Sequence, residues 1–427
     1  MRAAVRRAAP LPPRADAAGA GRAPKALRGA WRDLPIRHVV ESQQFSRPCL
    51  DLVFDTAERM EAVVPGTPAA RVLDGRIVAT LFYEPSTRTR LSFESAMARL
   101  GGTVLSTESA GEYSSAAKGE TLEGGGGGGG VAADRPRRRA PTPLPPSLSD
   151  TIRTVEGYAD AIVLRHFAAG SARAAAAAAG VPIINAGDGP GQHPTQALLD
   201  VYTIRRELGR LDGVKVALVG DLANGRTARS LAYLLSSFPG VSFVFAAPSV
   251  VRMGADIKEF LTERGVPWEE VGGGGEGGGV GGRGARATRA PTLAPLPHPQ
   301  ADDLAAVASK CDVLYQTRIQ KERFQVGAGG ARGEGTGGGA RAHARRPPYP
   351  HHQDRPDDYE AARGKFVVDT RVMDALPAAS IVMHPLPRVD EIDRPVDADP
   401  RAAYFRQAKN GLFVRMALLK LALLEDA

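Results

Sequence analysis

The sequence predicts an α/β protein with two doubly wound parallel-sheet domains joined by inter-domain helices. Short apolar runs flanked by turn formers alternate with amphipathic helical patterns, and this alternation favours parallel sheets covered by helices. The 427 residues are enough for two domains that each bury a core. The predicted strands are Arg76–Phe82, Ala161–Leu164, Pro182–Asn185, Val214–Val219, Ser242–Ala246, Val313–Tyr315, Phe366–Val368 and Ile381–His384.

Helical patterns lie between and around these runs. Apolar residues recur at helical spacing over Cys49–Ala62 and Thr89–Leu100. Gln192–Leu208 is a long helical stretch near the middle of the chain, so we expect it to connect the domains. Arg401–Leu424 is amphipathic and is expected to dock on the body of the protein. The expected division is a leader at 1–35, a first domain at 36–195, a second domain at 196–395 and a C-terminal helix at 396–427 that packs back on the first domain.

The N-terminal residues resemble a targeting segment. Residues 1–30 contain six Arg, one Lys and a single acid, and they lack a hydrophobic centre. A secretory signal needs such a centre, whereas a basic, acid-poor leader resembles an organelle transit peptide. We therefore expect a transit peptide over 1–35 and a chloroplast location. Because no Ser or Thr precedes Ser42, the mitochondrion, the cytoplasm and a basic tail without a targeting role stay open as alternatives.

Three low-complexity stretches, 124–149, 271–300 and 326–353, interrupt otherwise continuous structured sequence. Each has a Gly-rich opening, an Arg-rich middle and a Pro-rich close, a composition that cannot bury a core. We interpret them as translated, retained introns. The last two open on Val, whose codons begin with GT, and close on proline-rich runs ending in Gln, as a pyrimidine tract followed by CAG would be read. Genuine surface insertions in a GC-rich genome are the alternative.

The composition excludes several classes of partner. The net charge of +8 comes from the leader and the three stretches, because the remaining chain is mildly acidic. A nucleic-acid site needs Lys and Arg clustered on the folded surface, so we expect no nucleic-acid partner. No apolar run approaches the roughly 18–20 residues of a membrane span, so we expect no membrane partner. Cys49 and Cys311 show no metal-ligand spacing and are predicted to be ordinary buried thiols.

An anion site is predicted at residues 82–94, FYEPSTRTRLSFE, where a strand ends and a helix begins. The N–H groups and the dipole of a helix N-terminus bind phosphate, and Ser86, Thr87 and Thr89 add hydroxyl donors. Arg88 supplies a forked, charge-assisted contact. Hydroxyl residues also cap helices without binding a ligand. Two hydroxyl-then-Arg steps in succession favour the anion site over capping alone.

Further donors follow Gly-rich turns and strand ends. His193 and Gln196 stand three residues apart at a helix start and so share a face. A lone His is more often structural, and no second His or carboxylate stands at ligand spacing, so no metal is expected. Arg226 follows a strand and a Gly-rich turn, at the end where open α/β sheets bind ligands, but the turn lacks the patterns of nucleotide loops. Arg318 and Gln320 share a face if extended.

STRTR after a strand and HPTQ at a helix start resemble the transcarbamoylase family. The resemblance covers residues 40–425 outside the three stretches, and it implies the following site. Carbamoyl phosphate is bound by Ser86, Thr87, Arg88, Thr89, Ser114, Lys118, Arg165, His193, Gln196 and the backbone carbonyls of Pro385 and Leu386, and aspartate by Arg226, Arg318 and Gln320. The catalytic residues are Arg88, Lys118, Arg165 and His193. Because Ser114 and Lys118 act in a neighbouring subunit's site, the resemblance implies a homotrimer.

Within the family the motifs favour the aspartate branch, and plant members most closely. Lys118 and HPLPR suit that branch, whereas the Cys and the SMG segment of ornithine enzymes are missing. The implied reaction converts carbamoyl phosphate and L-aspartate to N-carbamoyl-L-aspartate and phosphate, in pyrimidine synthesis, with no metal or organic cofactor. Feedback inhibition by UMP is a further expectation. Transfer to another amino acid and a non-catalytic scaffold role are the alternatives.

Overall fold

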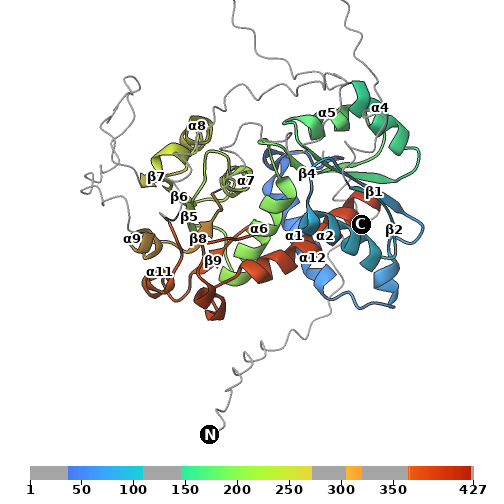
Figure 1. Ribbon diagram of the computed structural model, residues 1–427. Coiled ribbons are helices and arrows are strands. Elements are labelled where there is room, and N and C mark those ends of the chain that lie inside the picture. Colours follow the sequence, from blue (N-terminus) through green and yellow to red (C-terminus); the bar gives the residue numbers. More distant parts are fainter. Residues whose placement is uncertain (1–36, 109–145, 272–303, 320–363, 365, 425–427) are drawn as a thin grey trace, which may run out of the picture.

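The computed structural model describes residues 37–108, 146–271, 304–319, 364 and 366–424. In these residues the first sheet has four strands in the order β2-β1-β3-β4, and the second has five in the order β7-β6-β5-β8-β9 (Figure 1). Neighbouring strands in both sheets pair in parallel. The strands are β1 (Ile77–Phe82), β2 (Thr103–Glu108), β3 (Ala161–His166), β4 (Ile183–Asp188), β5 (Lys215–Val219), β6 (Ser242–Ala246), β7 (Trp268–Val271), β8 (Val313–Gln316) and β9 (Ile381–Met383).

Helices connect these strands. The α-helices are α1 (Arg47–Glu61), α2 (Thr87–Arg99), α4 (Pro146–Val155), α5 (Ser171–Ala178), α6 (Pro194–Leu208), α7 (Arg226–Leu235), α8 (Ala255–Glu263), α9 (Leu304–Ala308), α11 (Thr370–Ala375) and α12 (Tyr404–Leu423). Short 3-10 turns are η2 (Ser42–Gln44), η3 (Pro68–Arg71), η5 (Ser249–Val251) and η7 (Arg394–Ala398).

Each sheet is buried on both faces, as a doubly wound arrangement requires. Successive residues of a strand point to opposite faces. In β1, Val78 and Phe82 accordingly pack in the largest core cluster, whereas Ala79 and Leu81 pack in a second cluster with residues of α4 and α5. The residues of β5 divide in the same way, between the largest cluster and a third one that includes α9 and α11. The predicted fold class is confirmed.

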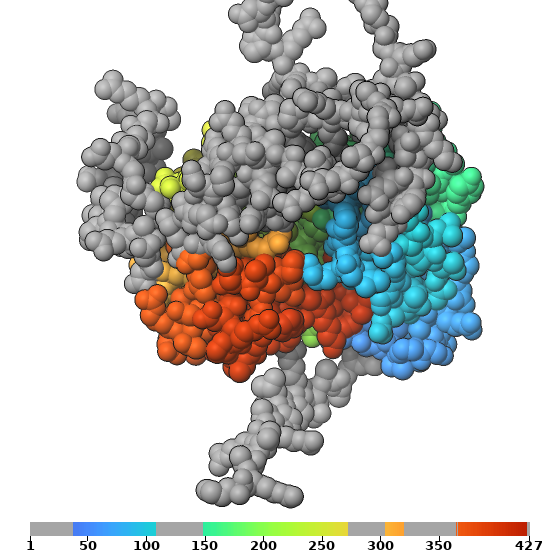
Figure 2. Space-filling model, in the orientation of Figure 1, coloured from blue at the N-terminus to red at the C-terminus, as the bar shows by residue number. Residues whose placement is uncertain are grey.

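Two helices join the sheets into one body. α6 leads from the first sheet to the second, and its residues are buried continuously from Pro194 to Ile204. α12 packs on α1, α2 and α6. Figure 2 shows the red C-terminal segment against the blue and cyan N-terminal segments. The largest core cluster therefore contains residues of both sheets and of these helices.

The predicted elements are found with small shifts in their ends, but three strand assignments differ. β2 and β7 are edge strands with largely exposed or half-buried residues, so they lack the apolar run by which a buried strand is found. The predicted strand at Phe366–Val368 is wrong, because there Val368 makes an isolated bridge with Ile392. Phe366 and Val368 are apolar because they cover a face of the second sheet.

Several predictions concern residues outside the described ranges. The leader 1–35, Ser114, Lys118, Gln320 and most of the three low-complexity stretches lie there. The end of the first stretch is different, because Pro146 begins α4 and Leu148, 3% exposed, packs beside the first sheet. Among the described residues, no helix is long and apolar enough to cross a membrane.

Candidate active site

The predicted anion loop lies where β1 ends and α2 begins. Ser86 occupies the N-cap position of α2, and its side chain does not cap the helix. The alternative in which Ser86 only caps the helix is therefore not supported, because its hydroxyl accepts no hydrogen bond from the first turn of α2. Thr87 and Arg88 are exposed and Thr89 is buried at the first turn. The loop thus presents hydroxyls and a guanidinium beside the N–H groups of a helix N-terminus, which is an arrangement that suits an anion.

Arg165 lies beside the segment that leads into this loop, and His193 lies near Arg165. Arg165, on β3, donates from Nη1 to the carbonyl of Ala186 at 3.1 Å, and its Nη2 lies 3.4 Å from Glu84. His193 stands at the N-cap of α6 and is 4% exposed. Its backbone N–H donates to the hydroxyl of Ser230 on α7 at 3.1 Å. His193 therefore joins the start of α6 to α7, which belongs to the second sheet's side of the molecule.

His193 is a neutral donor or acceptor rather than an acid at neutral pH. Burial lowers its pKa well below the usual range, and the nearby guanidiniums of Arg226, Arg165 and Arg415 lower it further. Its Nδ1 lies 3.4 Å from the Thr195 hydroxyl. When that hydroxyl donates to Nδ1, the proton of the neutral ring is on Nε2. The ring can then donate one hydrogen bond to a substrate oxygen without bringing a buried charge.

Arg226, on the second sheet's side of the molecule, places another guanidinium near Arg165 and His193. It is the first residue of α7, and its Nη1 donates to the carbonyl of Gly189 at 2.6 Å. It also lies 3.7 Å from Glu84, the residue that Arg165 contacts. One carboxylate from the first domain therefore lies between a guanidinium of each sheet.

Gly187 allows the two guanidiniums to come close. A Cβ at this position would lie 3.0 Å from Nη1 of Arg165 and 3.1 Å from Cζ of Arg226. Its φ of 116° is also a backbone conformation that L side chains rarely adopt. Space and backbone geometry both require glycine here.

Arg318 follows β8 and extends the cationic edge. It lies near the anion loop. Burial lowers the pKa of Arg88, and the positive charge of Arg318 lowers it further. Arg318 also faces the loop after β9, where it contributes to the lowered pKa of His384. Two like charges from different sheets are thus held near each other, which favours an anionic ligand between them.

The loop after β9 is held by His384. Its Nε2 pairs with Oε1 of Glu391 at 2.7 Å, and its Nδ1 accepts from the backbone N–H of Leu386 at 2.8 Å. Burial lowers the pKa of His384, and a neutral ring with its proton on Nε2 satisfies both contacts. Leu386 has a φ of 51°, and Pro385 and Leu386 are half-buried. Their backbone is therefore held in one conformation beside the site.

Sequence reasoning missed several polar residues that assemble these groups. Glu84 stands within the motif FYEPSTRTR, but the motif alone predicts no role for it. Asp200, one helical turn beyond Gln196, binds the Gln196 amide with its Oδ1 at 2.9 Å. Arg415 of α12 is buried, and burial lowers its pKa to about 10. Helical spacing would have found Asp200, whereas Glu84 and Arg415 depend on contacts between distant segments.

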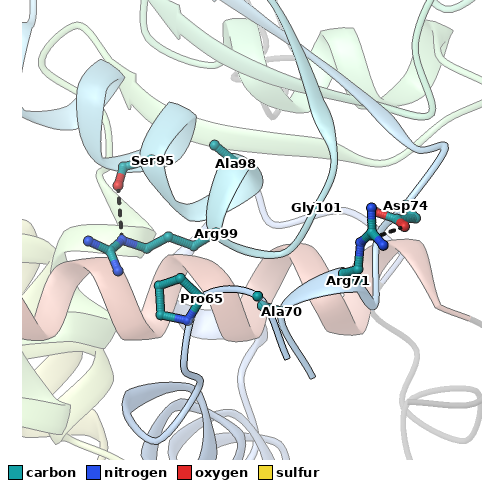
Figure 3. Close-up of a pocket in the computed structure, with 9 residues that line it drawn as sticks. Pro65, Ala70, Arg71, Asp74, Ser95, Ala98, Arg99 and Gly101 are labelled. Atoms are coloured by element: carbon teal, nitrogen blue, oxygen red, sulfur yellow. Dashed lines mark hydrogen bonds and ion pairs between the residues drawn. The ribbon is translucent and has the colours of Figure 1, made fainter. Parts of the chain in front are cut away.

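Two other features lie outside this site. A hollow of about 700 Å³ near the C-terminal end of α2 is lined by Arg71, Asp74, Ser95, Arg99 and their neighbours (Figure 3). It contains none of the predicted site residues. Within the described ranges, no group of three His, Cys, Asp or Glu side chains could hold a metal ion. Cys49 and Cys311 are buried free thiols, as predicted, and burial raises the pKa of each to about 12.

Comparison with known proteins gives a family for this arrangement. The model of the aspartate/ornithine carbamoyltransferase carbamoyl-P binding domain matches residues 37–124 and 145–206, and that of the Asp/Orn binding domain matches 297–422. The chain is 52% identical over 418 residues to the chloroplastic aspartate carbamoyltransferase of Oryza sativa subsp. japonica, with 97% of this chain and 92% of the relative covered. The chain belongs to the aspartate carbamoyltransferase family.

Other family members agree with this assignment. The chloroplastic aspartate carbamoyltransferase of Arabidopsis thaliana is 51% identical over 401 residues, covering 93% of this chain and 81% of the relative. A solved structure of Trypanosoma cruzi aspartate transcarbamoylase, in complex with carbamoyl phosphate and aspartate, is 34% identical with a TM-score of 0.66. It covers 92% of this chain and 98% of that chain. The family resemblance stated from the sequence is confirmed.

Proposed function

We propose that the chain transfers the carbamoyl group of carbamoyl phosphate to the amine of L-aspartate, giving N-carbamoyl-L-aspartate and phosphate in pyrimidine synthesis. One observation carries the proposal: Arg165 of the first sheet and Arg226 at the start of α7 both contact Glu84, and His193 lies near both guanidiniums. This arrangement supports a site in which donors for a carbonyl oxygen lie beside a cation for a carboxylate. The rice and Arabidopsis relatives carry the name of this activity.

The phosphate group binds first in this mechanism. Ser86, Thr87 and Thr89 donate from their hydroxyl and backbone groups, and Arg88 adds a charge-assisted contact. The pKa of Arg88 is lowered by its partial burial and by Arg318, so a bound anion relieves repulsion that is present without it. We propose that carbamoyl phosphate fills this position before aspartate binds.

Arg165 and His193 then act on the carbamoyl carbonyl oxygen. Negative charge grows on this oxygen when an amine attacks the carbon, so donors that are already in place stabilise the transition state more than the ground state. Gln196 and the backbone carbonyls of Pro385 and Leu386 bind the carbamoyl NH₂. These contacts orient the carbon toward the acceptor without a covalent enzyme intermediate.

The acceptor is held from the second domain. Arg226, Arg318 and Gln320 bind the two carboxylates of aspartate, and the domains close over both substrates and exclude water. The neutral amine attacks the carbamoyl carbon, the tetrahedral oxyanion collapses, and phosphate leaves with the proton that the amine loses. The orientation of the substrates and the fixed donors supply the catalysis, and no metal or organic cofactor takes part.

The active unit that we propose is a homotrimer in which Ser114 and Lys118 act in a neighbouring subunit's site. The family resemblance of the loop 114–121 supports this, because Lys118 adds a cation for the phosphate. Mixing two inactive variants, Lys118→Met and Arg165→Met, tests it. Recovery of activity on mixing is expected if the two residues belong to different subunits of one site, and no recovery would contradict the shared site.

The chloroplast is the compartment of the reaction, because the rice and Arabidopsis relatives are named chloroplastic. We propose that residues 1–35 are the transit peptide. We also propose that the first domain, 36–195, binds carbamoyl phosphate, that the second, 196–395, binds aspartate, and that 396–427 packs back on the first. We also propose that UMP inhibits the reaction, which can be tested by measuring the rate with and without UMP at several concentrations of carbamoyl phosphate.

The stretches 124–149, 271–300 and 326–353 are proposed to be retained introns. The interruption of the family match between 124 and 145 supports this for the first stretch. Its last residues do form a turn of α4, in which Leu148 is buried. Excision would join Glu123 to Asp150 and place Leu122 at the helical position of Leu148, so the same apolar contact could be kept.

Kinetics of two matched variants test the proposed roles. Arg88→Met should raise the KM for carbamoyl phosphate about 10- to 100-fold, because a charge-assisted hydrogen bond contributes about 1.5–3 kcal/mol. Arg318→Met should raise the KM for aspartate by a similar factor. The control is Arg371→Met on α11, an exposed side chain whose loss changes the net charge equally. Equal effects of Arg88→Met and Arg371→Met would contradict the assigned phosphate site.

A further inference from the structure

Asp200, which has no role in the mechanism above, lies at the centre of a buried hydrogen-bond network. It is fully buried on α6, one helical turn after Gln196. Its Oδ1 accepts from Nε2 of Gln196 at 2.9 Å and from Nε2 of Gln407 at 2.6 Å, and its Oδ2 accepts from the Tyr315 hydroxyl at 2.8 Å. The three donors come from α6, α12 and β8. A buried carboxylate is tolerated when it is hydrogen-bonded in this way.

The network fixes the orientation of the Gln196 side-chain amide. A side-chain amide has a donor end and an acceptor end. The orientation of Gln407 is set by the main chain, because its Oε1 accepts from the backbone N–H of His384 at 2.9 Å, and an N–H cannot accept. The NH₂ of Gln407 must then face Asp200, so Oδ1 is an acceptor. Gln196 must face the same oxygen with its own NH₂, which turns its carbonyl oxygen away from Asp200.

We propose that Asp200 is a positioning residue that holds the carbonyl oxygen of Gln196 toward the carbamoyl NH₂, so that the site selects a carbamoyl phosphate over an acyl phosphate. This inference rests on the proposed function, in which Gln196 binds that NH₂. An acetyl group has a methyl group in place of the NH₂ and cannot donate. A site with a fixed acceptor rejects a ligand that leaves the acceptor unpaired.

The same network reaches the second group of acceptors for the NH₂. Gln407 binds both Asp200 and the backbone of His384, which directly precedes Pro385 and Leu386. The two sides of the amide subsite are therefore linked through one carboxylate. Burial raises the pKa of Asp200 to about 7. The orientation holds in either protonation state, because a proton on Oδ2 can be donated to the Tyr315 hydroxyl while Oδ1 stays an acceptor.

If Asp200 had only a structural role, its substitution would have a different effect. Asp200 also ties α6 to α12, and its loss could weaken the site without changing what the site selects. The chain contains a matched link between the same helices, because Nδ2 of Asn410 donates to the Thr203 hydroxyl at 3.0 Å. Thr203 is buried and close in sequence to Asp200. Thr203→Val therefore removes a buried polar link between α6 and α12 without touching Gln196.

The test compares carbamoyl phosphate with acetyl phosphate and inorganic phosphate. Asp200→Leu keeps the approximate shape and removes the acceptor. We expect its KM for carbamoyl phosphate to rise about tenfold, the loss of roughly one hydrogen bond. The inhibition constants of acetyl phosphate and inorganic phosphate should change by less than about twofold. Asp200→Asn can keep an oxygen toward both glutamines and its NH₂ toward Tyr315, so it should retain the selectivity, as should Thr203→Val.

If Asp200→Leu does not fold, Asp200→Ala replaces it. Water in the vacated space both donates and accepts, so it no longer fixes the amide, and a loss of selectivity of about threefold is expected. Equal weakening of all three phosphates in the Leu or Ala variant would overturn the positioning role, as would a loss in Asp200→Asn as large as that in Asp200→Leu. All variants are made in the form without the leader and the three stretches, and absence of carbamoyl transfer by that form without further substitution would instead contradict the proposed function.

Discussion

Gly187→Ala is a single added methyl group that should disable the site while leaving the fold in place. The new Cβ would lie 3.0 Å from Nη1 of Arg165 and 3.1 Å from Cζ of Arg226. Both distances are shorter than ordinary van der Waals contact, so the guanidiniums must move by a few tenths of an ångström or more. One of them is proposed to stabilise the oxyanion and the other to bind aspartate, so a single substitution disturbs both substrates.

The expected size of the effect follows from these two displacements. Loss of one preorganised oxyanion donor costs about 10²- to 10³-fold in kcat. That range corresponds to about 2.7–4 kcal/mol, at about 1.36 kcal/mol per decade. The φ of 116° at Gly187 adds backbone strain of about 1–3 kcal/mol to the free energy of the folded state. We therefore expect kcat/KM for aspartate to fall at least 100-fold, together with a modest loss of stability.

Gly209→Ala is the matched control. Gly209 also has a positive φ, 72°, but a Cβ there would meet nothing within 4 Å. Steady-state kinetics and thermal unfolding of both variants separate the two effects. Gly209→Ala should lose stability and keep kcat/KM within about twofold, because the strain there is remote from the site. Wild-type kcat/KM in a folded Gly187→Ala variant would refute the close approach of the two guanidiniums.

Three further outcomes are expected. Burial lowers the pKa of His166 to about 4, below its usual value of 6.5, so the unfolded chain binds a proton that the folded chain rejects. Stability should therefore fall as the pH drops from 6.5 to 4, by about 3 kcal/mol from this group, and urea unfolding of His166→Asn should show a weaker acid dependence. The full 427-residue chain should be poorly active or insoluble, whereas the form without its leader and the three stretches should be active; equal activity in side-by-side assays would contradict the intron interpretation. Treatment with EDTA should leave the transfer rate unchanged, and a loss that added metal restores would contradict a metal-free mechanism.

The fold could be predicted from the sequence where the strands are central. Val214–Val219 and Ser242–Ala246 are apolar because helices cover both faces of the sheet at these strands, and their predicted ends agree with the observed ends to within a residue. Edge strands carry no such signal, and β2 was missed because its side chains are half-buried or exposed. Phe366–Val368 shows the opposite error, since burial outside a sheet produces the same apolar run as burial within one.

The site could be predicted in part, because its motifs are local. The loop Ser86–Thr89 and the pair His193 and Gln196 each lie at the start of a helix, and their spacing is visible in the sequence. The position of Arg226 beside Glu84 could not be predicted, because it depends on how two sheets meet. The orientation of Gln196 depends on a chain of contacts from α12 through Asp200, and no local pattern encodes it.

The acceptor specificity of the reaction tests the account most directly. Carbamoyl phosphate is supplied at saturation with either L-aspartate or L-ornithine, and the carbamoylated amino acid is measured colorimetrically. The cations Arg226 and Arg318 at the second sheet predict steady turnover with aspartate and none above background with ornithine, whose side chain is cationic. In the form without the leader and the three stretches, turnover with ornithine at a rate equal to or above that with aspartate, or no turnover with either, would contradict the proposed function.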